Sequence, residues 1–336
     1  MKILIDAYGG DNGAEAMAQA CAIAVNKHKD LTIEFVGKEE ELKSILTKFT
    51  YPQDKIIVTN ADSIITCEES PVEALRSKRD SSLVVCLDKL KTGEYAGLVS
   101  AGSTGAVLSG AVLKLGRIKG VSRPALSPLL PTIKGGKVLL LDCGANMDCK
   151  PINLCHFALM GSEYMKVMEG IENPRVALLN VGTEDAKGNE LAKEAHKLLS
   201  SLPINFVGNM EARDALSGEY DVIVADGFAG NVLLKSIEGT LKSFMGVLKD
   251  GLKSSFRGKI GGLLIKKPLK SVMKRYDYQA YGGSPLIGTK QIVVKAHGSA
   301  KIDSLVSAIE QVKDFKDQQL LTKIGNVMEN NQIIEE

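Results

Sequence analysis

Short apolar segments alternate with amphipathic segments along almost the whole chain, and this order limits the possible folds more than any other feature. Runs such as KILID, LTIEFVG and KVLLLDCG end in Gly, Asn or Asp and are followed by helical patterns. This alternation is typical of βα units, which build a mainly parallel sheet with helices on its faces. We therefore predict an α/β fold with a doubly wound, Rossmann-like sheet.

The composition is typical of a soluble globular protein. Hydrophobic residues make up 44% of the 336 residues and charged residues 24%, a balance that excludes a disordered chain. No apolar run approaches the roughly 20 residues that cross a bilayer, and the segment MKILIDAYGG lacks the features of a signal peptide. We expect a single domain over residues 1–336, located in the cytoplasm.

Positive charge is concentrated in one part of the chain. Residues 249–275 hold nine Lys or Arg and one Asp, so this stretch carries +8 while the remainder carries −6. Aromatic residues are only 5% of the chain, too few for the stacking platforms of a nucleic-acid-binding surface. The charge therefore indicates a different acidic partner.

The stretch GKIGGLLIKKPLK (258–270) predicts a helical hairpin within a basic, amphipathic protrusion over residues 241–280. We expect Gly261 and Gly262 to end its first helix and Pro268 to help start the second. An apolar tip ringed by cations suits an anionic bilayer surface, but a homodimer interface or an acidic carrier protein would use the same groups. The predicted membrane contacts are Leu263, Leu264, Ile265, Lys266 and Lys267.

The turn SAGSTGA is the best candidate for an anion site. In doubly wound sheets, ligands bind beyond the carboxyl ends of the strands, where such turns lie. Here glycines would expose backbone N–H groups and two hydroxyls at the start of a helix, which suits a phosphate. Helix capping explains the hydroxyls equally well. The candidate phosphate-binding residues are Gly102, Ser103, Thr104 and Gly105.

Four polar residues in other turns are further candidates. Lys187 in NVGTEDAKGNE could supply a fixed positive charge, and Asn231 in ADGFAGN could donate from its amide. Asp226 could anchor a ligand, although helix capping and solvation explain all three residues without one. His297 in AHGS is the histidine best placed for a site. Motifs for a nucleophilic side chain, a metal or a nucleotide are absent, so we expect no metal and no cofactor.

Eight motifs in one order resemble those of the bacterial phosphate acyltransferases, which are acyl-acyl carrier protein:phosphate acyltransferases of phospholipid synthesis. The similarity extends from about Ile3 to about Val312. Tyr8, Gly13 and Ala300 depart from the usual pattern without removing a charged group or an amide. The motifs are DAYGGDNG, SAGSTGA, LLDCGANMD, NVGTEDAKGNE, FVGNMEARD, ADGFAGN, YGGSPLIG and AHGS.

The resemblance implies transfer of a long-chain fatty acyl group from acyl carrier protein to inorganic phosphate. Phosphate is then the nucleophile, and the acyl phosphate passes to a membrane glycerol-phosphate acyltransferase. It also implies a fold like those of phosphotransacetylase and isopropylmalate dehydrogenase, and a homodimer at the inner face of the cell membrane. We assign catalytic roles to Lys187, Asn231 and His297, and phosphate binding to Asp226 with the SAGSTGA residues.

Other functions remain open at this point. A phosphotransacetylase-type enzyme using acyl-CoA would need similar phosphate and thioester loops. A non-catalytic membrane scaffold that binds carrier protein or lipid would use the basic hairpin alone. A nicotinamide-dependent decarboxylating dehydrogenase requires a metal site, and the scattered acids do not suggest one.

Overall fold

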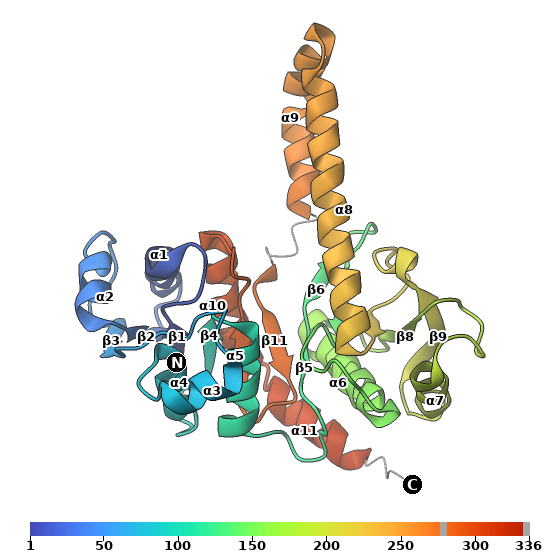
Figure 1. The fold of residues 1–336 in the computed structure, drawn as a ribbon, viewed down its shortest axis with the longest axis horizontal. Coiled ribbons are helices and arrows are strands. Elements are labelled where there is room, and N and C mark those ends of the chain that lie inside the picture. The colour runs from blue at the N-terminus through green and yellow to red at the C-terminus, as the bar shows by residue number, and fades with distance from the viewer. Residues whose placement is uncertain (276–280, 332–336) are drawn as a thin grey trace.

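The strands form two mainly parallel sheets in the computed structural model, which describes residues 1–275 and 281–331 (Figure 1). Adjacent strands are parallel except where β5, β6 and β11 pair with their neighbours. The first sheet has the spatial order β3 (Ile56–Asn60), β2 (Thr32–Gly37), β1 (Lys2–Asp6), β4 (Gly97–Ser100), β12 (Ile292–Lys295), β11 (Ser284–Ile287) and β5 (Ala125–Leu126). The second has the order β6 (Leu129–Pro131), β7 (Lys137–Leu141), β10 (Val222–Val224), β8 (Arg175–Asn180) and β9 (Asn205–Glu211). The predicted α/β class is confirmed, whereas the division into two sheets was not foreseen.

Helices cover both faces of the first sheet. Alternate residues of β1 show this arrangement, because Ile3 and Ile5 belong to the core under α1 and α10 while Leu4 belongs to the core under α4 and α5. Strand β1 is therefore buried on both faces, as its apolar sequence predicts, whereas the edge strand β3 is partly exposed. The helices of this half are α1 (Gly13–Lys27), α2 (Glu39–Leu46), α3 (Pro71–Ser77), α4 (Ser82–Leu90), α5 (Thr104–Gly110) with the π-helix η1 (Ala111–Leu115), and α10 (Ile302–Asp317).

One apolar core extends from the first sheet into the second. It contains Val99 and Val294 of the first sheet together with Leu141 and Val224 of the second. Packing between α6 and α11 contributes to this junction, and α8 covers the other face of the second sheet. The remaining helices are α6 (Pro151–Glu169), α7 (Glu190–Leu199), η2 (Ala212–Asp214), α8 (Gly227–Lys253), α9 (Phe256–Arg275) and α11 (Leu320–Asn330).

Helices α8 and α9 lie side by side and project from the rest of the molecule as a hairpin (Figure 1). The predicted helix break at Gly261 and Gly262, with a second helix starting near Pro268, is wrong, because all three residues lie within α9. The turn is at Ser254 and Ser255, and the Ser255 hydroxyl accepts a hydrogen bond from the Gly258 N–H at 3.0 Å. A helical glycine costs only about 1 kcal/mol, which packing against α8 can offset.

The apolar residues expected at the hairpin tip lie instead along α9. Leu263 and Leu264 expose 73% and 75% of their surfaces, two turns after the helix begins at Phe256. Residues 276–280, at the end of the predicted protrusion, lie outside the described part of the chain. Within the described part, every helix is too short or too polar to cross a bilayer.

Candidate active site

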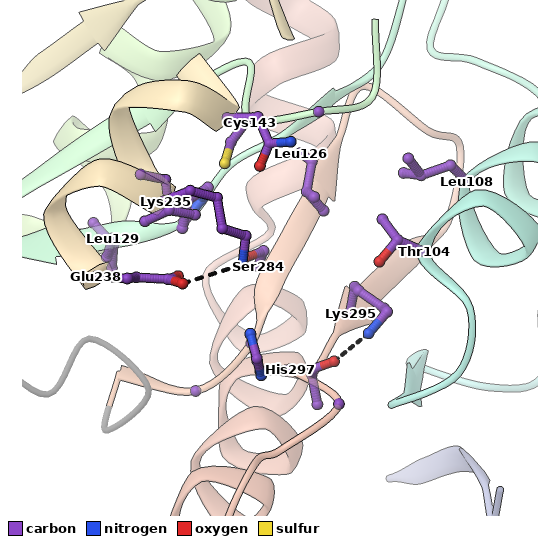
Figure 2. A pocket seen from close by; sticks show the side chains of 18 of the residues that line it. Thr104, Leu108, Leu126, Leu129, Cys143, Lys235, Glu238, Ser284, Lys295 and His297 are labelled. Carbon is purple, nitrogen blue, oxygen red and sulfur yellow. Dashed lines mark hydrogen bonds and ion pairs between the residues drawn. The ribbon is translucent and has the colours of Figure 1, made fainter. Parts of the chain in front are cut away.

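A cavity of about 400 Å³ opens between the two sheets. Its wall combines turns of both halves of the chain, and most of these turns follow the carboxyl end of a strand, as expected for this fold. Figure 2 shows the cavity from close by. Its lining includes Thr104 and Gly105 of α5, Gly144 after β7, Asn231, Lys235 and Glu238 of α8, and Lys295 and His297 at the end of β12.

Lys295 brings a buried cation to this cavity. Its side chain is 7% exposed, and its Nζ donates to the carbonyl oxygen of Ala101 at 3.3 Å and to that of Ala296 (Figure 2). Burial lowers the pKa of the Lys295 ammonium to about 8, against the smaller opposing effects of Cys67 and Asp6. Across residues 1–275 and 281–331, this ammonium makes no ion pair with a carboxylate.

The buried carboxylate of Asp6 holds the SAGSTGA turn in place through a hydrogen-bond network. Asp6 accepts hydrogen bonds from the hydroxyls of Ser82 at 2.6 Å and Ser100 at 2.7 Å, and Ser100 in turn accepts from the N–H of Gly102 at 3.1 Å. Burial raises the pKa of Asp6, while the two hydroxyl donors act in the opposite direction. The network fixes the backbone at the start of α5.

The first turn of the chain packs directly against this one. Gly9 has a φ of +92°, and a Cβ at this position would lie 2.2 Å from the Cα of Gly102. The N–H of Asp11 also donates to the carbonyl of Gly298 at 2.7 Å. The motifs DAYGGDNG, SAGSTGA and AHGS therefore meet at one edge of the first sheet.

The four predicted phosphate-binding residues of SAGSTGA occupy two layers. Thr104 and Gly105 line the cavity, whereas Gly102 and Ser103 are buried behind them. Ser103 is at the N-cap position, but its side chain makes no capping hydrogen bond. Capping therefore does not explain this hydroxyl.

Asn231 lies in the second turn of α8 and lines the cavity opposite Gly144. A Cβ at Gly144 would stand 3.7 Å from the Cγ of Asn231. The preceding Gly230 lets α8 approach the DCGAN turn, since a Cβ there would lie 1.9 Å from the carbonyl oxygen of Asp142. This close approach places the Asn231 amide at the cavity, and Asn231 does not cap the helix.

His297 also lines the cavity and is half-buried. Its Nδ1 accepts a hydrogen bond from the N–H of Ser299 at 3.1 Å, which assigns the proton of the neutral ring to Nε2. Burial, with Lys235 nearby, lowers the pKa of His297. The imidazole is therefore neutral near pH 7 and can act as a hydrogen-bond donor. The ammonium of Lys235 pairs with Glu238 at 3.1 Å (Figure 2).

The structure does not bring Lys187 and Asp226 to this cavity. Lys187 is exposed in the loop after β8, where its carbonyl accepts from the side chain of Asn180 at 3.1 Å. The Asp226 carboxylate caps α8 by accepting from the N–H of Ala229 at 2.7 Å, and it lines a separate hollow beside Phe228. The role predicted for each residue stays a prediction.

The main residue that sequence analysis missed is Lys295. Its signal was a lysine at the end of the buried apolar run IVVK, directly before AHGS. A charged residue there is unusual, because lysines are rarely buried without a specific role. Lys235 and Glu238 gave no such signal. They are the fourth and seventh residues of the amphipathic run that begins at Val232, and charged residues are common in such runs.

Comparison with known proteins gives matches over almost the whole chain. A family model described as fatty acid synthesis protein matches residues 1–323. A phosphate acyltransferase of Bacillus cereus strain G9842 is 45% identical over 333 residues, covering 99% of this chain and 100% of the relative. One of Bacillus cytotoxicus is 45% identical over 329 residues, covering 98% of each chain.

The fold is shared with a solved phosphotransacetylase from Streptococcus pyogenes. The TM-score is 0.62 at 17% identity, with 96% of this chain and 94% of the other covered. This likeness concerns the fold alone, whereas the family model and the full-length relatives concern the sequence. On those two findings, the chain belongs to the phosphate acyltransferases of the fatty acid synthesis protein family.

Proposed function

We propose that this protein transfers a long-chain fatty acyl group from acyl carrier protein to inorganic phosphate in the cavity between the two sheets. The observation that carries the proposal is Lys295, a buried cation without a carboxylate partner in the described chain, in the same cavity wall as Thr104 and Gly105 at the start of α5. Such a site attracts a small anion and holds it away from bulk water. Phosphate is the anion that the family's reaction requires.

In this proposal phosphate itself attacks the thioester. Its second ionisation, like that of a phosphorylated residue, lies near pH 6 to 7, so a dianionic oxygen is ready at neutral pH. One phosphate oxygen forms a bond to the carbonyl carbon, and the resulting tetrahedral oxyanion collapses with cleavage of the C–S bond. The pantetheine thiolate leaves and receives the proton that the hydrogen phosphate brought, so the products are the acyl phosphate dianion and the free thiol.

The cavity residues have separate tasks in this reaction. Lys295 and the N–H groups near Thr104 and Gly105 position the phosphate next to the thioester. The attack then becomes effectively unimolecular. The amide of Asn231 and the neutral ring of His297 are donors for the developing oxyanion. Lys187 lies outside the cavity, so we assign the main positive charge to Lys295.

The test is phosphate-dependent release of carrier-protein thiol from a long-chain acyl carrier protein. We expect release only when phosphate is present, together with an acyl phosphate that hydroxylamine traps. Acyl-CoA, run in parallel, measures the preference for the carrier protein. Release that is independent of phosphate would contradict the proposal.

We also propose that the protein is cytoplasmic, forms a homodimer and contacts the membrane surface through the α8–α9 hairpin. The exposed side chains of Leu263 and Leu264, with Lys266 and Lys267 next to them, support this contact. Apolar groups beside cations bind the boundary of an anionic bilayer. Contact there would bring the acyl phosphate close to a membrane glycerol-phosphate acyltransferase.

A further inference from the structure

A second hollow of about 390 Å³ adjoins the cavity at Leu108. Leu108 lines both spaces. Of two consecutive residues, Gly144 lines the cavity and Ala145 lines the second hollow. The hollow also gathers exposed apolar side chains, since Val112 and Leu113 are 37% and 64% exposed. An extended ligand could therefore pass over Leu108 from this hollow into the cavity.

Two arginines stand in the wall of this second hollow. Arg123 makes no hydrogen bond or ion pair within residues 1–275 and 281–331. Arg117 donates to the carbonyl of Ser122 but has no carboxylate partner in the same ranges. Guanidinium groups without acidic partners suit a phosphate, which they can bind with two parallel hydrogen bonds.

The length of the helical segment that leads from the cavity toward Arg117 is close to the length of one ligand in particular. Helix α5 and η1 extend from Thr104 at the cavity to Leu115, two residues before Arg117. At about 1.5 Å per residue, these twelve residues span roughly 17 Å. A phosphopantetheine arm has 13 bonds between its phosphorus and its sulfur, which corresponds to about 15 Å when it is extended like a peptide chain.

We propose that the second hollow binds the phosphopantetheine arm of the acyl donor, with its phosphate at Arg117 and Arg123. The arm passes Leu108 and places its thioester in the cavity. This inference rests on the proposed function and adds the residues that recognise the donor. Its wall suits the arm's chemistry, because Ser109 and the Oδ1 of Asn146 can meet the amides while Val112 and Leu113 meet the methyl and methylene groups. The Nδ2 of Asn146 is already bound to Pro124 and Asp142.

The test compares two small donors, a long-chain acyl-phosphopantetheine and the same acyl-pantetheine without the phosphate. We expect the wild-type protein to have a lower KM for the phosphorylated donor. Arg123→Ala should raise that KM about 10-fold or more and leave the acyl-pantetheine KM unchanged, since only the charge-assisted contact is lost. Arg117→Ala should act in the same direction.

Lys119→Ala is the matched control, because Lys119 is exposed nearby and pairs with Glu329 at 3.5 Å instead of lining the hollow. It should change neither KM. Equal effects of Arg123→Ala on both donors, or none on either, would overturn the inference.

A different occupant would give a different result. If the hollow holds the acyl chain, Leu113→Asp will slow long-chain donors more than short-chain donors while Arg123→Ala is silent, and this also overturns the inference. If the wild-type protein uses no thioester donor, both the proposed function and the inference are contradicted. If the protein turns over acyl carrier protein normally but Arg123→Ala does not distinguish the phosphorylated from the unphosphorylated donor, only the inference is contradicted.

Discussion

The ammonium of Lys295 lies 3.3 Å from the carbonyl oxygen of Ala101, so the end of β12 is tied to the turn that precedes α5. These two segments are almost two hundred residues apart in sequence. Their contact places a buried cation in the same cavity wall as Thr104 and Gly105 at the start of α5, a combination that neither segment provides alone.

Lys295→Met should lower kcat/KM for phosphate by about 100-fold, the usual cost of losing one preorganised donor. The folded state should become more stable, because a lysine whose pKa falls from 10.5 to about 8 opposes folding at pH 7 by roughly 3 kcal/mol. Steady-state kinetics and urea unfolding measure the two effects. Lys187→Met, at an exposed site outside the cavity, is the control and should stay close to wild type. An equal loss in both variants would favour the role first predicted for Lys187.

The pH dependence of the reaction should also reflect the charge of the Lys295 ammonium. Above about pH 8 the folded protein loses the Lys295 proton, so kcat/KM for phosphate should fall with a midpoint near that value. Stability should change in the opposite direction, because between about pH 8 and 10.5 the unfolded chain binds more protons and this group makes the free energy of unfolding rise. Lys295→Met should lack both trends, and a retained decline in activity would assign it to another group.

Asn231→Leu should reduce kcat by about 100-fold with little change in the KM for phosphate. The side chain keeps a similar volume but loses its donor, so only the stabilisation of the oxyanion is removed. Val232→Ala is a suitable control, since this neighbouring residue is 51% exposed and lines a different hollow. A rise in phosphate KM with unchanged kcat would instead place Asn231 in phosphate binding.

Replacing both Leu263 and Leu264 with Glu should abolish flotation with vesicles that contain anionic lipid. The change removes exposed apolar surface and adds negative charge beside Lys266 and Lys267. Thiol release in solution should be preserved, because the side chains that the structure describes in α9, residues 256–270, do not line the cavity. Sedimentation of the same variant tests the alternative, as loss of a dimer with unchanged flotation would identify a subunit contact.

Sequence periodicity predicted the type of most elements because buried parallel strands and amphipathic helices have distinct patterns. It did not predict two sheets, since strand alternation carries no information about which strands are neighbours. The helix boundaries near Gly261 were missed because packing against α8 outweighs a weak local preference. For the site, Thr104, Asn231 and His297 line the cavity, and the roles assigned to them stay predictions. Lys295 was overlooked because its burial depends on contacts with a distant turn.

Helix α8 has one further consequence. It runs without interruption from Asn231, Lys235 and Glu238 at the cavity to Lys253 beside the hairpin turn. At 1.5 Å per residue, its 27 residues form a rod about 40 Å long. The two ends of such a rod cannot rotate independently unless the helix bends or breaks. A rigid-body movement of the hairpin would therefore also move the three side chains at the base of α8.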